Sequence, residues 1–250
     1  MKIIPWEQLP LEMQTEEVRR YYDILKKKKV SLFLKRVFDL VMSALALALL
    51  WPVYLILAVA IKLDSPGPVF YRQVRVTQYG KEFRIHKFRT MVQDADKGSQ
   101  ITVNHDSRVT RVGRLIRACR LDEIAQLIDV IEGTVTLVGV RPETPKYVSA
   151  YTKEMMATLL LPAGVTNLAC IYFKDEAKLL DGVEDIDKAY IEEILPKKMY
   201  HNLKGIEQFS FFGDIKILVM TVLAVLGKEY RADKVSNETT ANETKEKVEI

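Results

Sequence analysis

The sequence predicts an α+β protein that is mostly helical, with an N-terminal re-entrant membrane helix kinked at Pro52, a small β-hairpin and a compact cytosolic domain with interfacial helices. Three observations predict this fold: a long apolar run near the N-terminus, two short β-rich runs separated by a turn, and apolar residues recurring at helical spacing. The chain of 250 residues leaves room for one compact domain once the apolar run and the polar ends are set aside.

The apolar run extends from Leu40 to Ile61, 22 residues without a charge. As a straight helix it would be about 33 Å long, enough to cross a bilayer core of about 30 Å. Its twelve Leu, Ile and Val residues contribute about −4 to −7 kcal/mol of insertion free energy. This gain exceeds the cost of about 3 kcal/mol for Pro52 in a helix interior. The run therefore predicts a membrane-inserted helix that bends at Pro52.

Both flanks of the run are basic, and Lys and Arg close to a membrane segment favour the cytoplasm. A straight span would place one flank outside, whereas a helix kinked at Pro52 returns both to the same face. The re-entrant form is therefore favoured, with a plain span as the alternative. A buried helix of a soluble protein is a third interpretation, but the run is longer than most buried helices. The basic residues are Lys26, Lys27, Lys28, Lys29, Lys35 and Arg36 before the run, and Lys62, Arg72, Arg75 and Lys81 after it.

Composition divides the chain into four segments. These are a polybasic extension (1–31), the re-entrant membrane helix (32–63), the cytosolic domain (64–227) and a polar tail expected to be disordered (228–250). Trp6, Tyr21 and Tyr22 leave open an additional interfacial helix in the extension.

The cytosolic domain begins after the breaker Ser65-Pro66-Gly67-Pro68. Ile124, Leu127 and Ile128 recur at spacings of three and four, which is typical of a helix. The expected elements are strands over 69–76 and 83–88 joined by a turn at 78–80, a helix over 115–131 capped by Gly133, a loop around 162–164, a helix over 188–195 and an interfacial or packed helix over 215–226.

Positive charge is concentrated just after the apolar run. Residues 62–120 contain 13 Lys or Arg against 5 Asp or Glu, whereas the whole chain carries only +4. Such a surface binds phosphates of lipid headgroups, nucleotides or nucleic acid, and the simplest alternative is a solvated basic face near anionic lipid. Because no recognition motif accompanies the charge, nucleic acid is not expected as a partner.

Asp122 and Glu123 are the strongest candidates for chemistry. An ionised aspartate can attack phosphorus, and a neighbouring glutamate can hold the Mg²⁺ that a diphosphate requires. The ordinary alternative is that acids in a first helical turn interact only with the helix dipole. They follow an arginine series, Arg108, Arg111, Arg114, Arg117 and Arg120.

The sequence contains few residues that indicate another kind of catalytic or metal site. His86, His105 and His201 stand alone, without a His-Glu-x-x-His pair. Neither a Gly-x-Gly-x-x-Gly nor a Walker loop occurs, and no serine lies in a Gly-x-Ser-x-Gly elbow. Cys119 and Cys170 are far apart in sequence, which argues against a disulfide framework or a thiolate metal site.

Several motifs occur in a fixed order along the chain. They are Lys35-Arg36-Val37-Phe38-Asp39, Ser65-Pro66-Gly67-Pro68-Val69-Phe70-Tyr71-Arg72-Gln73, Lys87-Phe88-Arg89-Thr90-Met91, Asp106-Ser107-Arg108-Val109-Thr110-Arg111, Leu121-Asp122-Glu123 and Leu137-Val138-Gly139-Val140-Arg141-Pro142-Glu143. The series resembles the motifs of the bacterial sugar transferase family. Members of this family are monotopic phosphoglycosyl transferases of the polyprenyl-phosphate type. The resemblance covers roughly residues 32 to 227, and so many ordered matches rarely arise by accident.

The resemblance implies a two-step reaction on the cytoplasmic face of the bacterial inner membrane. A nucleotide diphosphate sugar, usually a UDP-sugar, gives its phosphosugar to the enzyme, which passes it to polyprenyl (undecaprenyl) phosphate. Asp122 matches the family's nucleophile, and Glu123 matches the residue that helps hold Mg²⁺. The resemblance also implies contact with membrane lipids and a re-entrant helix with a central proline, here Pro52.

The resemblance further implies a set of residues that face the substrate or its phosphates. These are Lys87, Arg89, Thr90, Arg117, Arg141, Pro142, Glu143 and Thr166. Asn167 and Cys170 depart from the family pattern in a region near the nucleotide or sugar, so the sequence leaves the donor sugar open.

Two other classes of function remain open on the sequence alone. One is a membrane-bound hydrolase that cleaves a nucleotide diphosphate sugar through the same carboxylates, without a lipid acceptor. The other is a non-catalytic membrane scaffold whose basic face gathers anionic lipid. The sequence also leaves open the glycan pathway and the oligomeric state.

Overall fold

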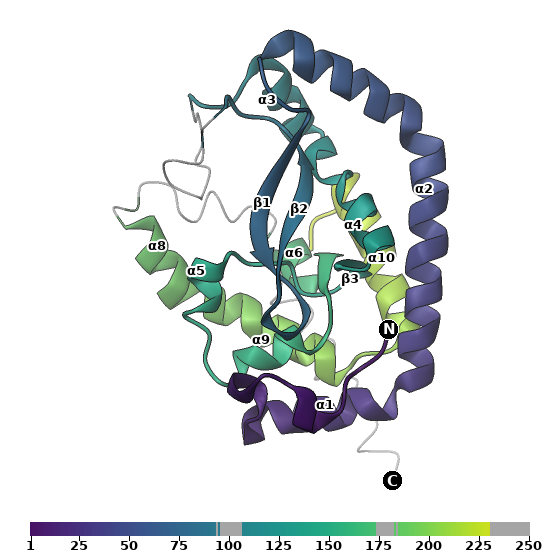
Figure 1. Cartoon of the computed structure of the whole chain (residues 1–250), viewed down its shortest axis with the longest axis vertical. Helices are drawn as coiled ribbons and strands as arrows, with labels where there is room; N and C mark the ends of the chain where they lie inside the picture. The colour runs from purple at the N-terminus through teal and green to yellow at the C-terminus, as the bar shows by residue number, and fades with distance from the viewer. Residues whose placement is uncertain (94, 96–106, 174–182, 184, 231–250) are drawn as a thin grey trace.

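The structure is a computed structural model. It describes residues 1–93, 95, 107–173, 183 and 185–230. Figure 1 shows one long helix, α2 (Lys29–Asp64), along one side of the molecule, a β-hairpin in the middle, and three helices on the opposite side: α5 (Pro145–Val148), α8 (Ile186–Ala189) and α9 (Leu195–Glu207). The described fold is mostly helical with a small antiparallel hairpin and one long apolar N-terminal helix, as the sequence predicts. His105, Asp106 and most of the expected tail, residues 231–250, lie outside the described residues.

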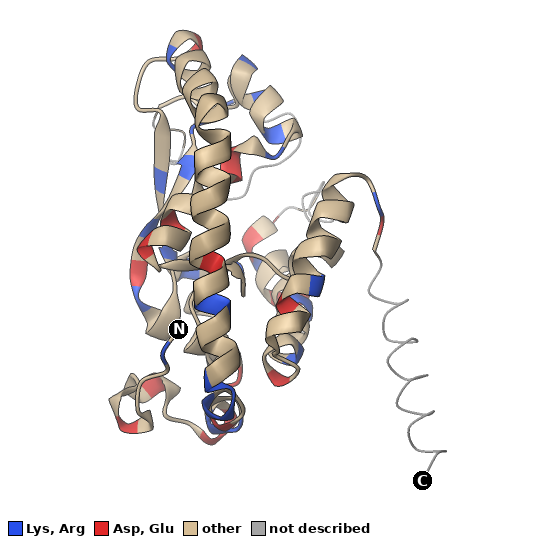
Figure 2. Cartoon of the chain, turned by 90° about the vertical axis from the view of Figure 1, so that its right-hand side faces the viewer, with Lys and Arg blue, Asp and Glu red and all other residues tan. Residues whose placement is uncertain are grey.

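The long helix α2 spans Lys29–Asp64 and continues through Pro52. Among the described residues it is the one helix long and apolar enough to cross a membrane. Leu49 and Leu55 are 79% and 58% exposed, so α2 is not the buried core helix of a soluble protein. In Figure 1 the upper part of α2 leans over the hairpin, and in Figure 2 its middle is free of charged residues.

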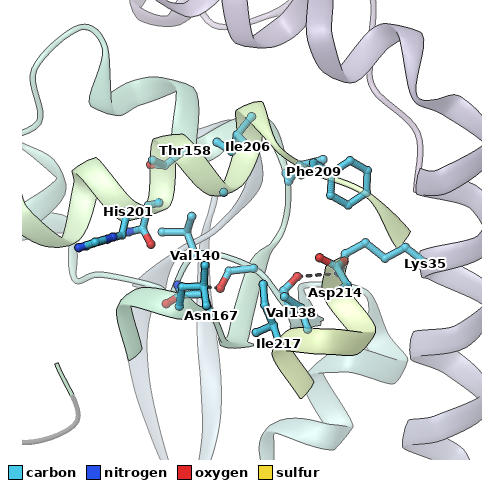
Figure 3. Close-up of a pocket in the computed structure, with 15 residues that line it drawn as sticks. Lys35, Val138, Val140, Thr158, Asn167, His201, Ile206, Phe209, Asp214 and Ile217 are labelled. Carbon is cyan, nitrogen blue, oxygen red and sulfur yellow. Dashed lines mark hydrogen bonds and ion pairs between the residues drawn. The ribbon is translucent and has the colours of Figure 1, made fainter. Parts of the chain in front are cut away.

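Buried ionic contacts fix the N-terminal part of α2 to the domain. The side chain of Lys35 is only 3% exposed and donates to the carboxylate of Asp214 and to the carbonyl oxygen of Val138, each at 2.6 Å (Figure 3). One turn later, the carboxylate of Asp39 accepts a hydrogen bond from the hydroxyl of Thr136. Since a buried charge is costly unless it is paired, these contacts specify how this end of α2 docks.

The C-terminal end of α2 is held by the same domain. The carboxylate of Asp64 accepts from the backbone N–H of Val112 at 2.9 Å. The guanidinium of Arg89 donates to the carbonyl oxygens of Ser65 and Pro66, each at 2.7 Å. Both ends of the apolar helix therefore contact one compact unit.

The N-terminal extension packs into the domain. Helix α1 (Glu16–Lys27) begins at Thr15, whose side chain accepts from a backbone N–H of the first turn. Tyr21 and Tyr22 are 3% and 2% exposed in the main core, which also contains residues of η6 (Met155–Leu160). These two aromatic residues therefore attach α1 to the core of the domain. Two short 3₁₀ helices precede α1, η1 (Trp6–Gln8) and η2 (Leu11–Met13).

The predicted hairpin is confirmed to within one residue at each end. Strands β1 (Phe70–Val76) and β2 (Glu82–Phe88) pair antiparallel, with Phe70 opposite Phe88. The turn η3 (Gln78–Gly80) joins them.

The single helix predicted over 115–131 is wrong, because the structure has two. Helix α3 (Arg111–Ala118) ends before Arg120, whose φ of +52° lies in the left-handed region. Helix α4 (Gln126–Glu132) follows, and Gly133 with φ +89° ends it as predicted. Apolar residues recur every three or four positions both in one continuous helix and in two helices that follow each other. The periodicity therefore does not reveal the break between α3 and α4.

The expected loop around residues 162–164 is instead part of a strand. Strand β4 (Ala163–Thr166) pairs parallel with β3 (Val135–Val138). Gly164 packs directly on the backbone of Gly139: a Cβ at Gly164 would lie 2.2 Å from the backbone N and O of Gly139. A Pro-Ala-Gly sequence reads as a turn, and only the neighbouring strand makes it extended.

We expect Gly164→Ala to destabilise the protein by about 1–3 kcal/mol, because the added methyl group meets backbone atoms that cannot move away without separating β3 and β4. The measurement is thermal unfolding of the purified protein. Gly205→Ala is the matched control, since a Cβ at Gly205 on α9 meets nothing within 4 Å and removing a helical glycine stabilises by about 0.4–1 kcal/mol. Equal melting temperatures for the two variants would contradict the close approach.

Apart from β3 and β4, the elements described after α4 are helical. The predicted helix over 188–195 lies within a longer helical run, and the predicted last helix coincides largely with α10. Asp214 and Thr221 of α10 face the domain, whereas Phe212 and Val222 are 80% and 59% exposed. The elements are α5 (Pro145–Val148), α6 (Leu168–Tyr172), α8 (Ile186–Ala189), a π-helical turn η7 (Tyr190–Ile194), α9 (Leu195–Glu207) and α10 (Phe211–Val225).

Candidate active site

The acidic pair lies in a short turn between two helices. After the left-handed residue Arg120, the 3₁₀ turn η5 (Leu121–Glu123) carries Asp122 and Glu123 toward the end of β2, where Lys87 lies. The pair therefore lies in a 3₁₀ turn that leads through Ile124 and Ala125, both right-handed helical, into α4.

Glu123 is ion-paired through both carboxylate oxygens. Arg141 donates from Nη1 to Oε2 at 2.9 Å and from Nη2 to Oε1, and Lys87 donates to Oε1 at 3.3 Å. Burial alone would raise the pKa of Glu123, but the charges and hydrogen bonds of Arg141 and Lys87 outweigh it and hold this pKa far below its ordinary range. Glu123 is therefore a fixed negative charge.

Asp122 has the opposite electrostatic environment. Burial raises the pKa of its carboxyl, and the adjacent charge of Glu123 raises it further, while Lys87 and Arg117 act against the shift. The net direction is upward. Two neighbouring carboxylates with pKa values moved apart are a recurring property of catalytic sites.

Asp122 lines a cleft of about 930 Å³ beside the hairpin, which is in the size range of small-molecule sites, about 300–1,000 Å³. Among the described residues that line the cleft, Asp122 is the one acid. The basic lining residues are Arg72, Arg75, Arg84, Lys87, Arg89, Arg108, Arg117 and Lys146. A cleft of this size with such walls suits a ligand with more than one phosphate.

Five residues expected at the site therefore meet at this cleft. They are Lys87, Arg89, Thr90, Arg117 and Asp122. Arg117, in the last turn of α3, donates from Nε to the hydroxyl of Thr90 at 3.0 Å. Arg89 lines the cleft but donates to the carbonyl oxygens after α2, so its guanidinium also connects the cleft to the apolar helix.

The structure places the other expected residues away from the lining of the cleft. Arg141 reaches the site through Glu123. The carbonyl oxygen of Pro142 accepts a hydrogen bond from Arg75 at 2.9 Å. The next residue, Glu143, is buried and only 7% exposed. The hydroxyl of Thr166 shares a 2.8 Å hydrogen bond with that of Thr221 on α10.

Sequence reasoning missed the hairpin arginines as site residues. Arg72 and Arg84 lie on the two paired strands and line the cleft together with Arg75 and Lys146. The excess of positive charge over residues 62–120 could have indicated the three arginines, Arg72, Arg75 and Arg84. Nothing in the sequence places Lys146 near Asp122.

Glu123 is the carboxylate at the site that the sequence predicts as a ligand of Mg²⁺. This ion prefers oxygen ligands, keeps several waters and takes one or two carboxylates together with substrate phosphates. Glu123 provides a permanently ionised carboxylate next to the cleft, but both of its oxygens are already engaged by Arg141 and Lys87. Glu123 would hold Mg²⁺ only by exchanging a contact with Arg141 or Lys87 for the ion, and the other ligands would be waters and phosphate oxygens.

A second group with metal-ligand atoms surrounds His86. Atoms of His86, Asp129 and Glu132 lie within 4.8 Å of one another. Asp129 uses both oxygens on His86, accepting from its backbone N–H at 2.9 Å and facing its ring Nδ1 at 2.8 Å. This arrangement ties α4 to β2, in agreement with a structural histidine.

A small cavity of about 70 Å³ lies at the end of β3, between α9 and α10 (Figure 3). Its walls are mainly apolar side chains such as Val138, Ile206 and Phe209, and the Lys35–Asp214 pair lies at one end. This cavity is too small for a nucleotide and is separate from the cationic cleft.

The cleft combines basic side chains with Asp122, the one acid in its described lining, and the same domain carries the long, exposed apolar helix α2. This arrangement is typical of a class of proteins that handle phosphates close to an apolar boundary. A family model described as bacterial sugar transferase matches residues 30–228. The chain belongs to the bacterial sugar transferase family.

Several curated relatives are similar to this chain. A UDP-N-acetylgalactosamine-undecaprenyl-phosphate N-acetylgalactosaminephosphotransferase of Aeromonas hydrophila is 35% identical over 198 residues, 78% of this chain and 44% of the relative. A UDP-glucose:undecaprenyl-phosphate glucose-1-phosphate transferase of Caulobacter vibrioides is 37% identical over 203 residues, 77% of this chain and 69% of the relative. One of the same description from Escherichia coli is 35% identical, over 77% of this chain and 40% of the relative. The chain thus spans less than half the length of two of these three relatives.

Proposed function

We propose that this chain moves a phosphosugar from a nucleotide diphosphate sugar, a UDP-sugar by analogy with its relatives, to polyprenyl (undecaprenyl) phosphate. The single observation that carries the proposal is Asp122: the one acid among the described residues of a cationic cleft, next to the permanently ionised Glu123. The relatives' descriptions support the substrate classes. In this proposal the product begins the membrane stage of surface glycan synthesis.

The proposed reaction consists of two displacements at phosphorus. The ionised carboxylate of Asp122 attacks the phosphorus that carries the sugar, the bond to the nucleoside phosphate breaks, and a nucleoside monophosphate leaves. A phosphate oxygen of the lipid then attacks the aspartyl-phosphosugar, and the carboxylate of Asp122 is regenerated. Dividing the transfer in this way means that the soluble donor and the lipid acceptor need not be bound together.

The basic residues of the cleft stabilise the charge that develops on the diphosphate. Lys87 donates to Glu123 at 3.3 Å, and the charges of Lys87 and Arg117 both lower the pKa of Asp122 against the effect of burial. We propose Mg²⁺ as the cofactor, with Glu123 as its protein ligand; when bound it would neutralise charge on the diphosphate. Activity is then expected to depend on added Mg²⁺ and to be lost on chelation.

The proposed location is the cytoplasmic face of the bacterial inner membrane, with α2 re-entrant around Pro52 and membrane lipids as partners. The docking of both ends of α2 supports this arrangement: Lys35 near one end and Asp64 at the other bond to the same domain. A helix that crossed the bilayer would carry one of these ends to the opposite side. The outward apolar face of α10 would lie in the same interface.

The pH dependence of the first step follows from the environment of Asp122. Its pKa is raised and the nucleophile must be ionised, so kcat/KM is expected to fall as pH decreases through a value above the ordinary range of aspartate. Lys87 lowers this pKa, so Lys87→Met is expected to move the acid limb to higher pH. Lys81→Met, in the hairpin turn, is the control and should leave the limb in place. A limb at or below ordinary aspartate values contradicts the assignment.

The experiment that tests the proposed function supplies purified full-length protein with a panel of radiolabelled nucleotide sugars, undecaprenyl phosphate and Mg²⁺. Transfer of one label into the organic phase names the donor. Sugar phosphate released without lipid favours a hydrolase. If no label moves with any donor, while neutralising Lys26 to Lys29 abolishes vesicle binding, a scaffold is the better description.

A further inference from the structure

Glu143 is a charged residue that the proposed reaction does not use directly. Its carboxylate is 7% exposed and accepts from the hydroxyl of Tyr190 at 2.5 Å and from the ammonium of Lys198 at 3.3 Å. Lys198 also donates to the hydroxyl of Tyr190 at 2.8 Å. All three side chains are buried, and the two partners come from η7 and α9, about 50 residues further along the chain.

The π-helical turn explains how two residues eight positions apart reach one carboxylate. In a regular α-helix, side chains eight residues apart point about 80° away from each other. A π-turn accommodates one additional residue, so the pair is placed as if seven residues apart, within about 20°. The turn begins at Tyr190 and ends before Lys198. This irregularity in the helix therefore aligns both donors on Glu143.

The loop that contains Glu143 is fastened on both sides of Arg141. Before it, the carbonyl oxygen of Val140 accepts from the backbone N–H of Gly164 at 2.7 Å. After it, the carbonyl oxygen of Glu143 accepts from the backbone N–H of Val76 at 2.9 Å. The Glu143 side chain adds the buried contact to Tyr190 and Lys198. Between these points the side chain of Arg141 donates to both carboxylate oxygens of Glu123.

We propose that Glu143, Tyr190 and Lys198 are positioning residues that orient Arg141 on Glu123, so that Glu123 faces the diphosphate. This inference rests on the proposed function. It assigns the buried carboxylate to geometry and not to substrate contact. It also gives a catalytic consequence to two residues, Tyr190 and Lys198, that no sequence motif singles out.

The test is a double-mutant cycle between Tyr190→Phe and Arg141→Ala in the full-length protein. Tyr190→Phe removes one hydroxyl and leaves the ring. Partners of this kind typically change activity about 10–100-fold, so we expect kcat to fall by about that factor, with the donor KM changed less than about 3-fold. In the Arg141→Ala background the same substitution should change kcat less than about 2-fold, because the residue through which it acts is absent.

Tyr147→Phe is the matched control. The ring of Tyr147 lies 4.6 Å from that of Tyr190, and its hydroxyl is also bonded to a carboxylate, but to that of Asp187 at 2.7 Å. It should lower the melting temperature about as much as Tyr190→Phe while changing kcat less than 3-fold. If Tyr190→Phe does not fold, the double variant Glu143→Gln/Lys198→Met, which removes both charges together, takes its place in the cycle.

The outcomes distinguish a failure of the proposed function from a failure of the positioning role. If the wild-type protein transfers no phosphosugar, the proposed function fails. If the wild type is active but Tyr190→Phe retains its kcat, or lowers it equally with and without Arg141, the positioning role is overturned and the three residues are only structural.

Discussion

Replacing Asp122 with asparagine is expected to abolish both the covalent phosphosugar adduct and turnover, with kcat reduced by about 10⁴-fold or more. The substitution preserves shape but replaces the attacking carboxylate with an amide, which is a far weaker nucleophile. Losing a nucleophile costs factors of this size in other covalent enzymes. Asp122 lines the cleft, and Lys87 and Arg117 remain in place around it, so donor binding should be retained.

The measurement is intact-protein mass spectrometry after mixing with the donor alone. Wild-type protein should gain the mass of one sugar phosphate, and Asp122→Asn should gain none. Asp23→Asn is the control, because Asp23 is 47% exposed on α1 in a pair with Arg19. Substantial turnover by purified Asp122→Asn, or kinetics that require both substrates to be bound at once, would contradict the assignment of Asp122 as the nucleophile.

The largest expected loss of stability comes from Lys35→Met. This change leaves the carboxylate of Asp214 buried without its cation and removes the donor to Val138. Breaking a buried ion pair from one side typically costs about 3–5 kcal/mol, equivalent to about 6–20 °C in melting temperature for a domain of this size. The measurement is thermal unfolding in detergent or lipid nanodiscs.

Lys29→Met is the matched control, because Lys29 is exposed at the start of α2 and surface changes are usually within about 0.5 kcal/mol. Replacing both partners, Lys35→Met with Asp214→Met, should recover much of the loss, because no unpaired charge remains. A single Lys35→Met variant as stable as the wild type would show that the pair does not fix the docking of α2.

The sequence predicted the elements whose patterns are local. The apolar helix and the hairpin are confirmed because hydrophobic runs and period-two strands are determined by neighbouring residues. The break at Arg120 was missed, since a left-handed arginine has no sequence signature of the kind that glycine provides. Strand β4 was missed because its pairing with β3 joins residues far apart in the chain.

The candidate site was predicted in part. Asp122 and Glu123 stood out as an adjacent pair, and the motif order identified Lys87, Arg117 and Arg141. Their different electrostatic roles did not follow from sequence, because the pKa of each carboxyl depends on which cations lie beside it in space.

By itself, the sequence determined that a long apolar helix with basic flanks precedes a mostly helical domain with a hairpin and an acidic pair. Only the tertiary structure decided that both ends of this helix dock on one domain, that Arg141 and Lys87 hold Glu123 while Asp122 faces the cleft, and that Tyr190 and Lys198 converge on Glu143. The physical reason is that hydrophobic periodicity acts between neighbours in the chain, whereas desolvation and charge pairing depend on residues that folding brings together.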